Sequence, residues 1–149
     1  MSRPPFEELP HLWLRDGSYR DVYILGTSLS DWAELSNLAR EFPHSYRRDG
    51  VINPLPDEAV VFGDREHSHL LSISVGNAII NCHFFIPTEI ELDVDPREVH
   101  GSEDHDAILL FVERLSAATG KLARITDESS ENSVHLEFDP KSNTWRAGQ

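Results

Sequence analysis

The stretch that decides the fold is LLSISVGNAIINCHFFI, residues 70–86. In its first half, Leu71, Ile73 and Val75 alternate with serines. This is the two-residue period of a β-strand with one buried face and one face in water. Gly76-Asn77 follows, and this pair suits the two-residue turn of a β-hairpin. The stretch therefore predicts two antiparallel strands joined by a tight turn.

The returning strand of this hairpin is apolar on both of its faces. One face carries Ile80, Cys82, Phe84 and Ile86, and the other carries Ile79, Asn81, His83 and Phe85. A strand with two apolar faces is typical of the centre of a sheet that is covered by a helix. We therefore expect this strand in the middle of the fold, with Cys82 as a small buried hydrophobic residue.

Further strands and two helices flank the hairpin. Strands are expected at 22–25, 89–94, 121–126 and 133–138, where apolar residues cluster or alternate. Helices are expected in 27–42 and 103–119, because apolar residues recur there every three or four positions. Hairpins dominate this order. It predicts an α+β fold: a mostly antiparallel sheet of about five to six strands with two main helices packed on it.

The chain of 149 residues has the length of about one domain. We expect a single globular domain over 1–149, with residues 1–10 and 140–149 peripheral. No apolar stretch approaches the roughly 20 residues that cross a bilayer, and the start lacks the apolar region of a signal peptide. Cys82 is the sole cysteine, so no internal disulfide can form. These features predict a cytoplasmic protein.

A net charge of −13 is the strongest global signal in the sequence. Residues 87–139 hold 14 acidic and 4 basic side chains, a net charge of −10, whereas residues 1–86 carry −5. Such a field repels nucleic acid and anionic membranes, and it speeds encounter with cationic proteins. The charge therefore argues against nucleic-acid or membrane binding and favours a basic protein as partner. Solubility alone is the alternative explanation.

Three histidines form a candidate metal site. His67 and His69 lie two residues apart, which on a strand places both imidazoles on one face. His83, on the other arm of the hairpin, could converge with them in the manner of a catalytic zinc site. The alternative is an exposed histidine pair before a strand. No HExxH motif or cysteine pair accompanies the three histidines.

The segment EDHD, Glu103 to Asp106, opens the second expected helix. The helix dipole stabilises acidic groups in a first turn by roughly 0.3–1 kcal/mol each, so no catalytic role is needed to explain them. A nucleophilic pair of Cys82 and His83 is disfavoured, because adjacent strand residues point to opposite faces. We therefore expect no enzymatic activity and no cofactor.

Two stretches carry a resemblance to a known class of proteins: RDVYILGTSLSDWAELSNLAREF at 20–42 and DAILLFVERLSAATGKLARITDESSENS at 106–133. They resemble small acidic bacterial proteins of about this length that are often found beside polymorphic or contact-dependent growth-inhibition toxins. Many such proteins are immunity proteins. The resemblance is one of style across most of the chain, and it carries over no functional residue by position.

Charge and resemblance together predict an immunity protein that binds and neutralises a cognate toxin, a basic nuclease domain, through an acidic surface. The residues expected to contact the toxin are Glu89, Glu91, Asp93, Glu98, Glu103, Asp104 and Asp106. An exposed aromatic side chain is expected to add a hot spot. Two alternatives stay open: a small metal-dependent enzyme that uses the histidine cluster, and a regulatory or scaffold domain that oligomerises through an edge strand.

Overall fold

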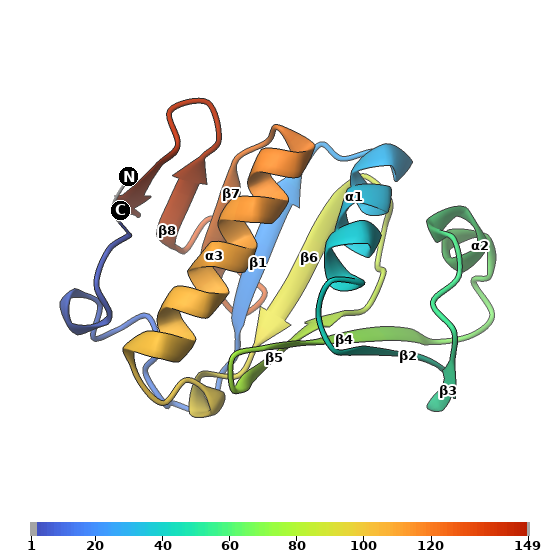
Figure 1. Ribbon diagram of the computed structural model, residues 1–149, viewed down its shortest axis with the longest axis horizontal. Helices are drawn as coiled ribbons and strands as arrows, with labels where there is room; N and C mark the ends of the chain where they lie inside the picture. Colours follow the sequence, from blue (N-terminus) through green and yellow to red (C-terminus); the bar gives the residue numbers. More distant parts are fainter. Residues whose placement is uncertain (1–2, 149) are drawn as a thin grey trace.

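A computed structural model describes residues 3–148, and the strands of this part of the chain form one antiparallel sheet (Figure 1). The sheet has nine strands in the order β3-β2-β4-β5-β6-β1-β7-β8-β9. The strands are β1 (Arg20–Leu25), β2 (His44–Arg48), β3 (Val51–Asn53), β4 (His69–Val75), β5 (Ala78–Cys82), β6 (Glu89–Val94), β7 (Ala123–Asp127), β8 (Val134–Asp139) and β9 (Thr144–Ala147). The helices are α1 (Leu29–Ala39), α2 (Glu58–Gly63), α3 (Ser102–Thr119) and the short 3-10 helices η1 (Phe6–Glu8) and η2 (Pro96–Glu98).

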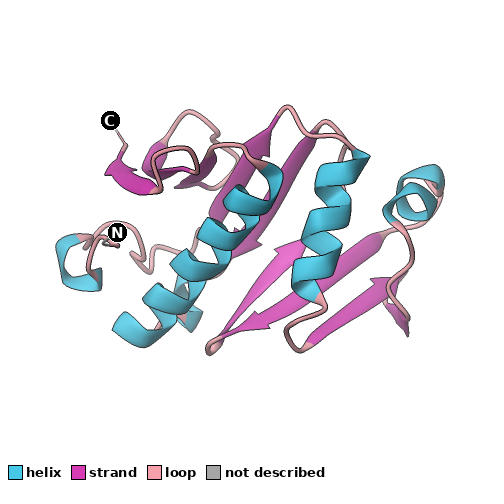
Figure 2. Cartoon of the chain, turned by 45° about the horizontal axis from the view of Figure 1, so that its top comes forward, coloured by secondary structure: helices cyan, strands magenta, loops and turns pink. Residues whose placement is uncertain are grey.

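The helices and the sheet make two layers with the core between them. Figures 1 and 2 show α1 and α3 lying across the same face of the sheet. Apolar side chains of the central strands face these helices and are buried: Val22, Ile24, Leu71, Ile73, Val75, Ile80, Ile90, Leu92 and Val94. The helices contribute five buried side chains to the same core: Leu35, Ile108, Phe111, Val112 and Leu115. This is the α+β class that the sequence predicts.

Local signals in the sequence set the ends of the main elements. Gly76, at φ +61°, forms the tight turn between β4 and β5, and Val75 pairs with Ala78 across it. At the start of α1, the Asp31 carboxylate accepts the Ser28 backbone N–H at 3.0 Å, which is half of a capping box. Gly120, at φ +69°, ends α3 in the left-handed conformation that favours glycine.

The prediction of about five to six strands is too low, because three short strands were not recognised. Within the described residues, β2, β3 and β9 extend the sheet to nine. Strand β2 has the sequence HSYRR, and of its five side chains only that of Tyr46 is buried. The apolar residues Val60, Val61 and Phe62 belong to the short helix α2, and Phe62 packs against Trp32 of α1 at 4.8 Å between ring centroids.

The returning strand of the central hairpin ends earlier than its apolar pattern predicts. Strand β5 stops at Cys82, because Phe84 adopts a left-handed φ of +56° and turns the chain. Ile86 is therefore 46% exposed, and the prediction that it lies in the core is wrong. The second apolar face of β5 is not covered by a helix either, since Ile79 is exposed.

Both end segments make specific contacts with α3. The guanidinium of Arg3 donates to the Glu113 carboxylate at 2.6 Å, and the Trp145 indole of β9 donates to the same carboxylate at 2.8 Å. The carbonyl of Pro4 lies 2.7 Å from Nε2 of His105. Of the segments 1–10 and 140–149, residues 1, 2 and 149 lie outside the described part.

Candidate partner-binding surface

The sheet face turned away from α1 and α3, here called the open face, gathers the outward side chains of the central strands. On β6 these side chains are half-buried and alternate with the buried residues of the core, whereas on β1 Asp21 and Tyr23 are themselves buried and Leu25 is exposed. The strand register places three pairs opposite one another on this face: Asp21 with Asp93, Tyr23 with Glu91, and Leu25 with Glu89. Four carboxyl groups thus lie side by side on two neighbouring strands.

The environment of these four carboxyl groups disfavours their ionised form. The pKa values of Asp21, Glu89, Glu91 and Asp93 are all raised, first by partial burial and then by neighbouring carboxylates. The Asp93 charge adds to the raised pKa of Asp21, and the charges of Asp21, Glu89 and Asp93 add to the raised pKa of Glu91. The open face is therefore a concentrated negative patch whose charges repel one another.

Neutral donors hold two of these carboxylates in place. Asp21 accepts the Ser129 backbone N–H at 2.7 Å and lies 3.3 Å from the Tyr23 hydroxyl. Asp93 accepts the side-chain amide of Asn81 at 3.0 Å, and His83 Nε2 lies 3.3 Å from its other oxygen. These contacts fix the geometry of the carboxylates and leave most of the negative charge without a permanent counter-charge.

The loop between β7 and β8 brings further acidic groups to the same face. Ser129, at φ +57°, places its N–H on Asp21. Glu128 in this loop contributes to the raised pKa of both Asp21 and Asp93, and Glu131 contributes to that of Glu89. The acidic patch therefore combines two strands with a neighbouring hairpin loop.

A basic strip adjoins the acidic patch on the side of β9. Arg124 of β7 lies opposite Tyr23, Glu137 of β8 lies opposite Arg124, and Arg146 of β9 lies opposite Glu137. Both guanidinium groups donate to the Glu137 carboxylate, Arg124 at 2.9 Å and Arg146 at 2.5 Å. One glutamate thus compensates two arginines. The charge of the open face therefore changes from negative on the β6 side to positive on the β7 side.

The left-handed turn at Phe84 exposes an aromatic side chain beside the patch. Phe84 itself is buried against Trp32, with ring centroids 5.3 Å apart. On either side of it, His83 and Phe85 stack on each other at 5.5 Å with an interplanar angle of 21°. Phe85 is 51% exposed, and through its stacking on His83 it lies beside Asp93.

The seven residues predicted to contact a partner do not form one surface. Glu89, Glu91 and Asp93 lie on the open face, whereas Glu103 and Asp106 are exposed in the first turns of α3 on the helical side. Glu98 lies in η2, where its carboxylate accepts the Ile79 N–H at 2.9 Å.

Asp104 differs from the other predicted contact residues because it is only 4% exposed. Its carboxylate accepts the backbone N–H groups of His100 and Asn77 at 2.9 and 3.0 Å. These hydrogen bonds, that of His100 first, lower its pKa. Asp104 therefore connects the start of α3 to the β4–β5 turn. Its carboxylate is buried and is not on the protein surface.

The three candidate metal ligands each bind a different neighbour. His69 is buried, with Nδ1 2.5 Å from the Tyr46 hydroxyl and Nε2 2.8 Å from the Asp64 carbonyl. His67 Nδ1 lies 2.5 Å from the Asp49 carboxylate, and His83 pairs with Asp93. Across residues 3–148, no three His, Cys, Asp or Glu side chains form a group that could hold a metal ion.

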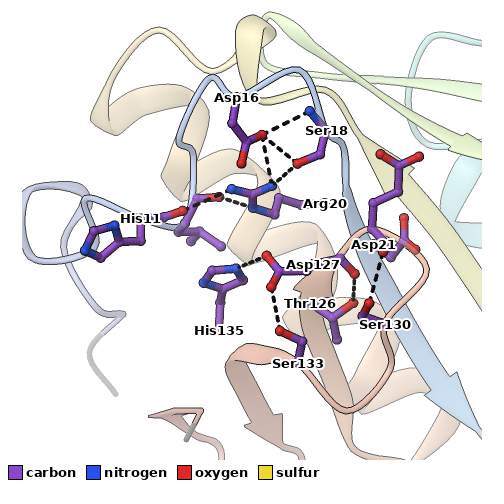
Figure 3. A network of polar contacts seen from close by, with 12 residues as sticks. His11, Asp16, Ser18, Arg20, Asp21, Thr126, Asp127, Ser130, Ser133 and His135 are labelled. Atoms are coloured by element: carbon purple, nitrogen blue, oxygen red, sulfur yellow. Dashed lines mark hydrogen bonds and ion pairs between the residues drawn. The ribbon is translucent and has the colours of Figure 1, made fainter.

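A second polar network lies under the N-terminal segment (Figure 3). Arg20, 2% exposed, donates to the backbone carbonyls of Leu12 and His11 at 2.6 and 3.1 Å. Nearby, Asp127 accepts the Ser133 hydroxyl at 2.5 Å and lies 2.7 Å from His135 Nε2. In a hydrolase triad the histidine stands between serine and aspartate. Here the aspartate stands between them, so this trio does not place a base on the serine.

The sequence interpretation missed Asp21, Tyr23 and Leu25 of the open face. The run at 22–25 predicts a strand, and in the sequence Asp21 and Tyr23 alternate with the apolar Val22 and Ile24. That alternation was a usable signal. Their position beside β6 was not, because it depends on pairing between strands far apart in the sequence.

No protein-family model, curated protein or solved structure matches the chain. Within residues 3–148, none of the helices is long and apolar enough to cross a membrane.

Proposed function

We propose that the chain is an immunity protein that binds a basic bacterial toxin domain of the nuclease class in the cytoplasm. The open face is the contact surface. The observation that carries this proposal is the row of half-buried carboxyl groups from Glu89, Glu91 and Asp93 on a sheet face that α1 and α3 leave uncovered, with the buried Asp21 beside them. Their mutual repulsion is a cost to the fold that a cationic partner would remove.

Like charges directly opposite each other on neighbouring strands destabilise a sheet, on the scale of roughly 0.2–1 kcal/mol per pair. Departures from such local rules are expected chiefly at functional or strained sites. Asp21 opposite Asp93 is such a pair, and Glu91 lies next to both. A patch of this kind supports a role in binding rather than in folding.

A nuclease domain is a suitable partner, because it needs basic residues to hold phosphates. A complementary negative surface accelerates association and suppresses binding to wrong partners. The carboxylates are attached to central strands and held by Ser129 and Asn81, so little side-chain freedom is lost on binding. The exposed Phe85 beside them supplies apolar contact area of the kind found at binding hot spots.

The test uses the toxin domain encoded beside the gene for this chain, with association measured at several salt concentrations. The open-face variant carries Glu89→Gln, Glu91→Gln and Asp93→Asn. A matched control carries Glu7→Gln, Glu8→Gln and Glu34→Gln, which remove the same charge from exposed sites on η1 and α1. We expect the open-face variant to associate at least tenfold more slowly at low salt and to lose most of the salt dependence.

A third variant, with Glu103→Gln and Asp106→Asn, separates the helical side from the open face. We expect it to behave like the control. If the open-face variant associates as fast as the control, the open face is not the contact surface. If the unmodified chain does not bind the toxin domain or protect cells from it, the immunity function itself is wrong.

A further inference from the structure

A hollow of about 340 Å³ opens on the open face beside the carboxylates. Its lining consists of Tyr23, Leu25, Gly26, Lys121, Leu122 and Arg124. Leu25 and Leu122 are 39% and 40% exposed, so two aliphatic side chains face solvent at its walls. Gly26 has a φ of +68°, and a Cβ built on it would meet nothing within 4 Å. The hollow is thus open and mainly apolar, and Lys121 and Arg124 are the charged members of its lining.

The charges around the hollow differ between its two sides. On the β6 side, Leu25 lies opposite Glu89 and Tyr23 lies opposite Glu91. On the β7 side, each cation already has a carboxylate: Lys121 pairs with Asp31 at 3.1 Å and Arg124 pairs with Glu137 at 2.9 Å. Arg146 shares Glu137 with Arg124, so the β7 side keeps a positive charge, and the negative charge beside the hollow comes from Glu89 and Glu91 of β6.

A further apolar side chain borders Glu89 on its other side. Ile86 bridges to Glu89 and is exposed. Glu89 therefore lies between two exposed aliphatic residues, Leu25 and Ile86. A carboxylate in such surroundings binds a cation more strongly once a partner excludes water, because the local dielectric falls.

We propose that this hollow is the anchor site for a protein partner: it takes one large apolar side chain, flanked by a lysine or arginine that reaches Glu89 and Glu91. The proposal rests on the proposed function, which it deepens by naming the chemistry of the contacting segment. Interfaces are commonly held by one or a few apolar anchors in such pockets, surrounded by polar contacts. The acidic patch then sets the association rate, and the hollow sets the lifetime of the complex.

The first test needs no toxin. Capped tripeptides Arg-Trp-Arg, Arg-Ala-Arg and Glu-Trp-Glu are titrated into the protein, and the methyl resonances of all leucines are followed by NMR. We expect Arg-Trp-Arg to shift the methyl signals of Leu25 and Leu122, with an affinity at least tenfold higher than that of either other peptide. The double variant Glu89→Gln, Glu91→Gln should weaken this binding to the level of Glu-Trp-Glu.

The second test measures the complex with the toxin domain. The variant Leu25→Ala, Leu122→Ala should raise the dissociation rate at least tenfold and change the association rate less than twofold. The matched control is Leu29→Ala, Leu110→Ala, since these leucines are 42% and 44% exposed on the helical layer. The control should bind like the unmodified chain.

The outcomes separate this proposal from the proposed function. If the toxin complex forms but Leu25→Ala, Leu122→Ala dissociates no faster than the control, the anchor site is wrong and the immunity function stands. If Arg-Trp-Arg shifts the two methyl signals but no toxin domain binds, the site stands and the function is wrong. Equal shifts with Glu-Trp-Glu would overturn the stated chemistry. Loss of a dimer in the leucine variant, seen by solution mass, would also overturn it, by assigning the hollow to a second copy.

Discussion

Asp21 and Asp93 lie directly opposite each other on β1 and β6, where Asp21 is buried and Asp93 is half-buried. Burial raises both pKa values, and the Asp93 charge adds to the effect on Asp21. The pair therefore connects the stability of the fold to its proposed contact surface. Neutralising the pair favours the folded state, whereas keeping it ionised favours a basic partner.

The stability of the protein should pass through a maximum at mildly acidic pH. The pKa values of Asp21, Glu91 and Asp93 are raised in the folded state, so the folded state binds more protons than the unfolded chain between their ordinary and raised values. The free energy of unfolding therefore rises as the pH falls through that window. At lower pH it falls, because hydrogen bonds lower the pKa values of Asp104 and Asp127, and their protonation costs stability.

Thermal unfolding between pH 7 and pH 3 measures this curve. We expect the melting temperature to rise first and then to drop. In the double variant Asp21→Asn, Asp93→Asn, the initial rise should be smaller, since the repulsive pair is absent at every pH. A melting temperature that falls steadily from pH 7 downward would contradict the prediction.

Arg20→Met should destabilise the fold strongly. The buried guanidinium satisfies the carbonyls of Leu12 and His11, and methionine can donate to neither. Each buried group left without a partner costs about 1–3 kcal/mol, so we expect a total loss of at least about 2 kcal/mol in the free energy of unfolding. Urea unfolding gives the value. Arg15→Met, at an exposed arginine of the same segment, is the control and should change stability by less than about 0.5 kcal/mol.

Phe84→Ala should lower the free energy of unfolding by about 3–5 kcal/mol, the usual loss for a buried phenylalanine. Phe84 packs against Trp32, Phe62 and Tyr46, so its removal opens a cavity among aromatic rings. The neighbouring variant Phe85→Ala removes an exposed ring and should change stability by less than about 0.5 kcal/mol. Similar losses in the two variants would show that the aromatic cluster is not the source of stability.

Cys82 should be unreactive in the folded protein. It is fully buried, and burial raises the pKa of its thiol to about 12. Thiolate is the reactive form, so a thiol reagent at pH 8 should label it only through unfolding. We expect labelling to be complete within minutes in denaturant and to be slow without it. Rapid labelling of the native protein would place Cys82 in a more accessible site than the core of β5.

The elements that the sequence predicts well are those with a strong period and a clear stop. Strand β4 alternates over its whole length, and α3 combines an apolar stripe with Gly120 at its end. Strand β2 escapes this reasoning, because Tyr46 is its one buried side chain and the rest is polar or charged. It is a strand because it pairs with β4, and such pairing is a tertiary effect.

The candidate surface also contains features that the local sequence pattern predicts and features that depend on tertiary pairing. Alternation with a buried strand face predicts that Glu89, Glu91 and Asp93 point outward. It does not reveal that Asp21 faces Asp93, since this depends on strands that are far apart in the sequence. It also does not reveal that the Asp104 carboxylate accepts hydrogen bonds from the backbone N–H groups of His100 and Asn77. Charge at a helix start can be read from the sequence, but its hydrogen-bond partners cannot.

The place of β1 in the sheet determines when the protein can fold during its synthesis. Strand β1 is flanked on both sides by strands made much later, β6 at 89–94 and β7 at 123–127. When translation has reached residue 88, β1 has been made but neither β6 nor β7 exists to pair with it. Burial of Val22 and Ile24 has to wait for the second half of the chain. The β1 segment therefore stays without its sheet neighbours until residues 89–94 and then 123–127 have been made.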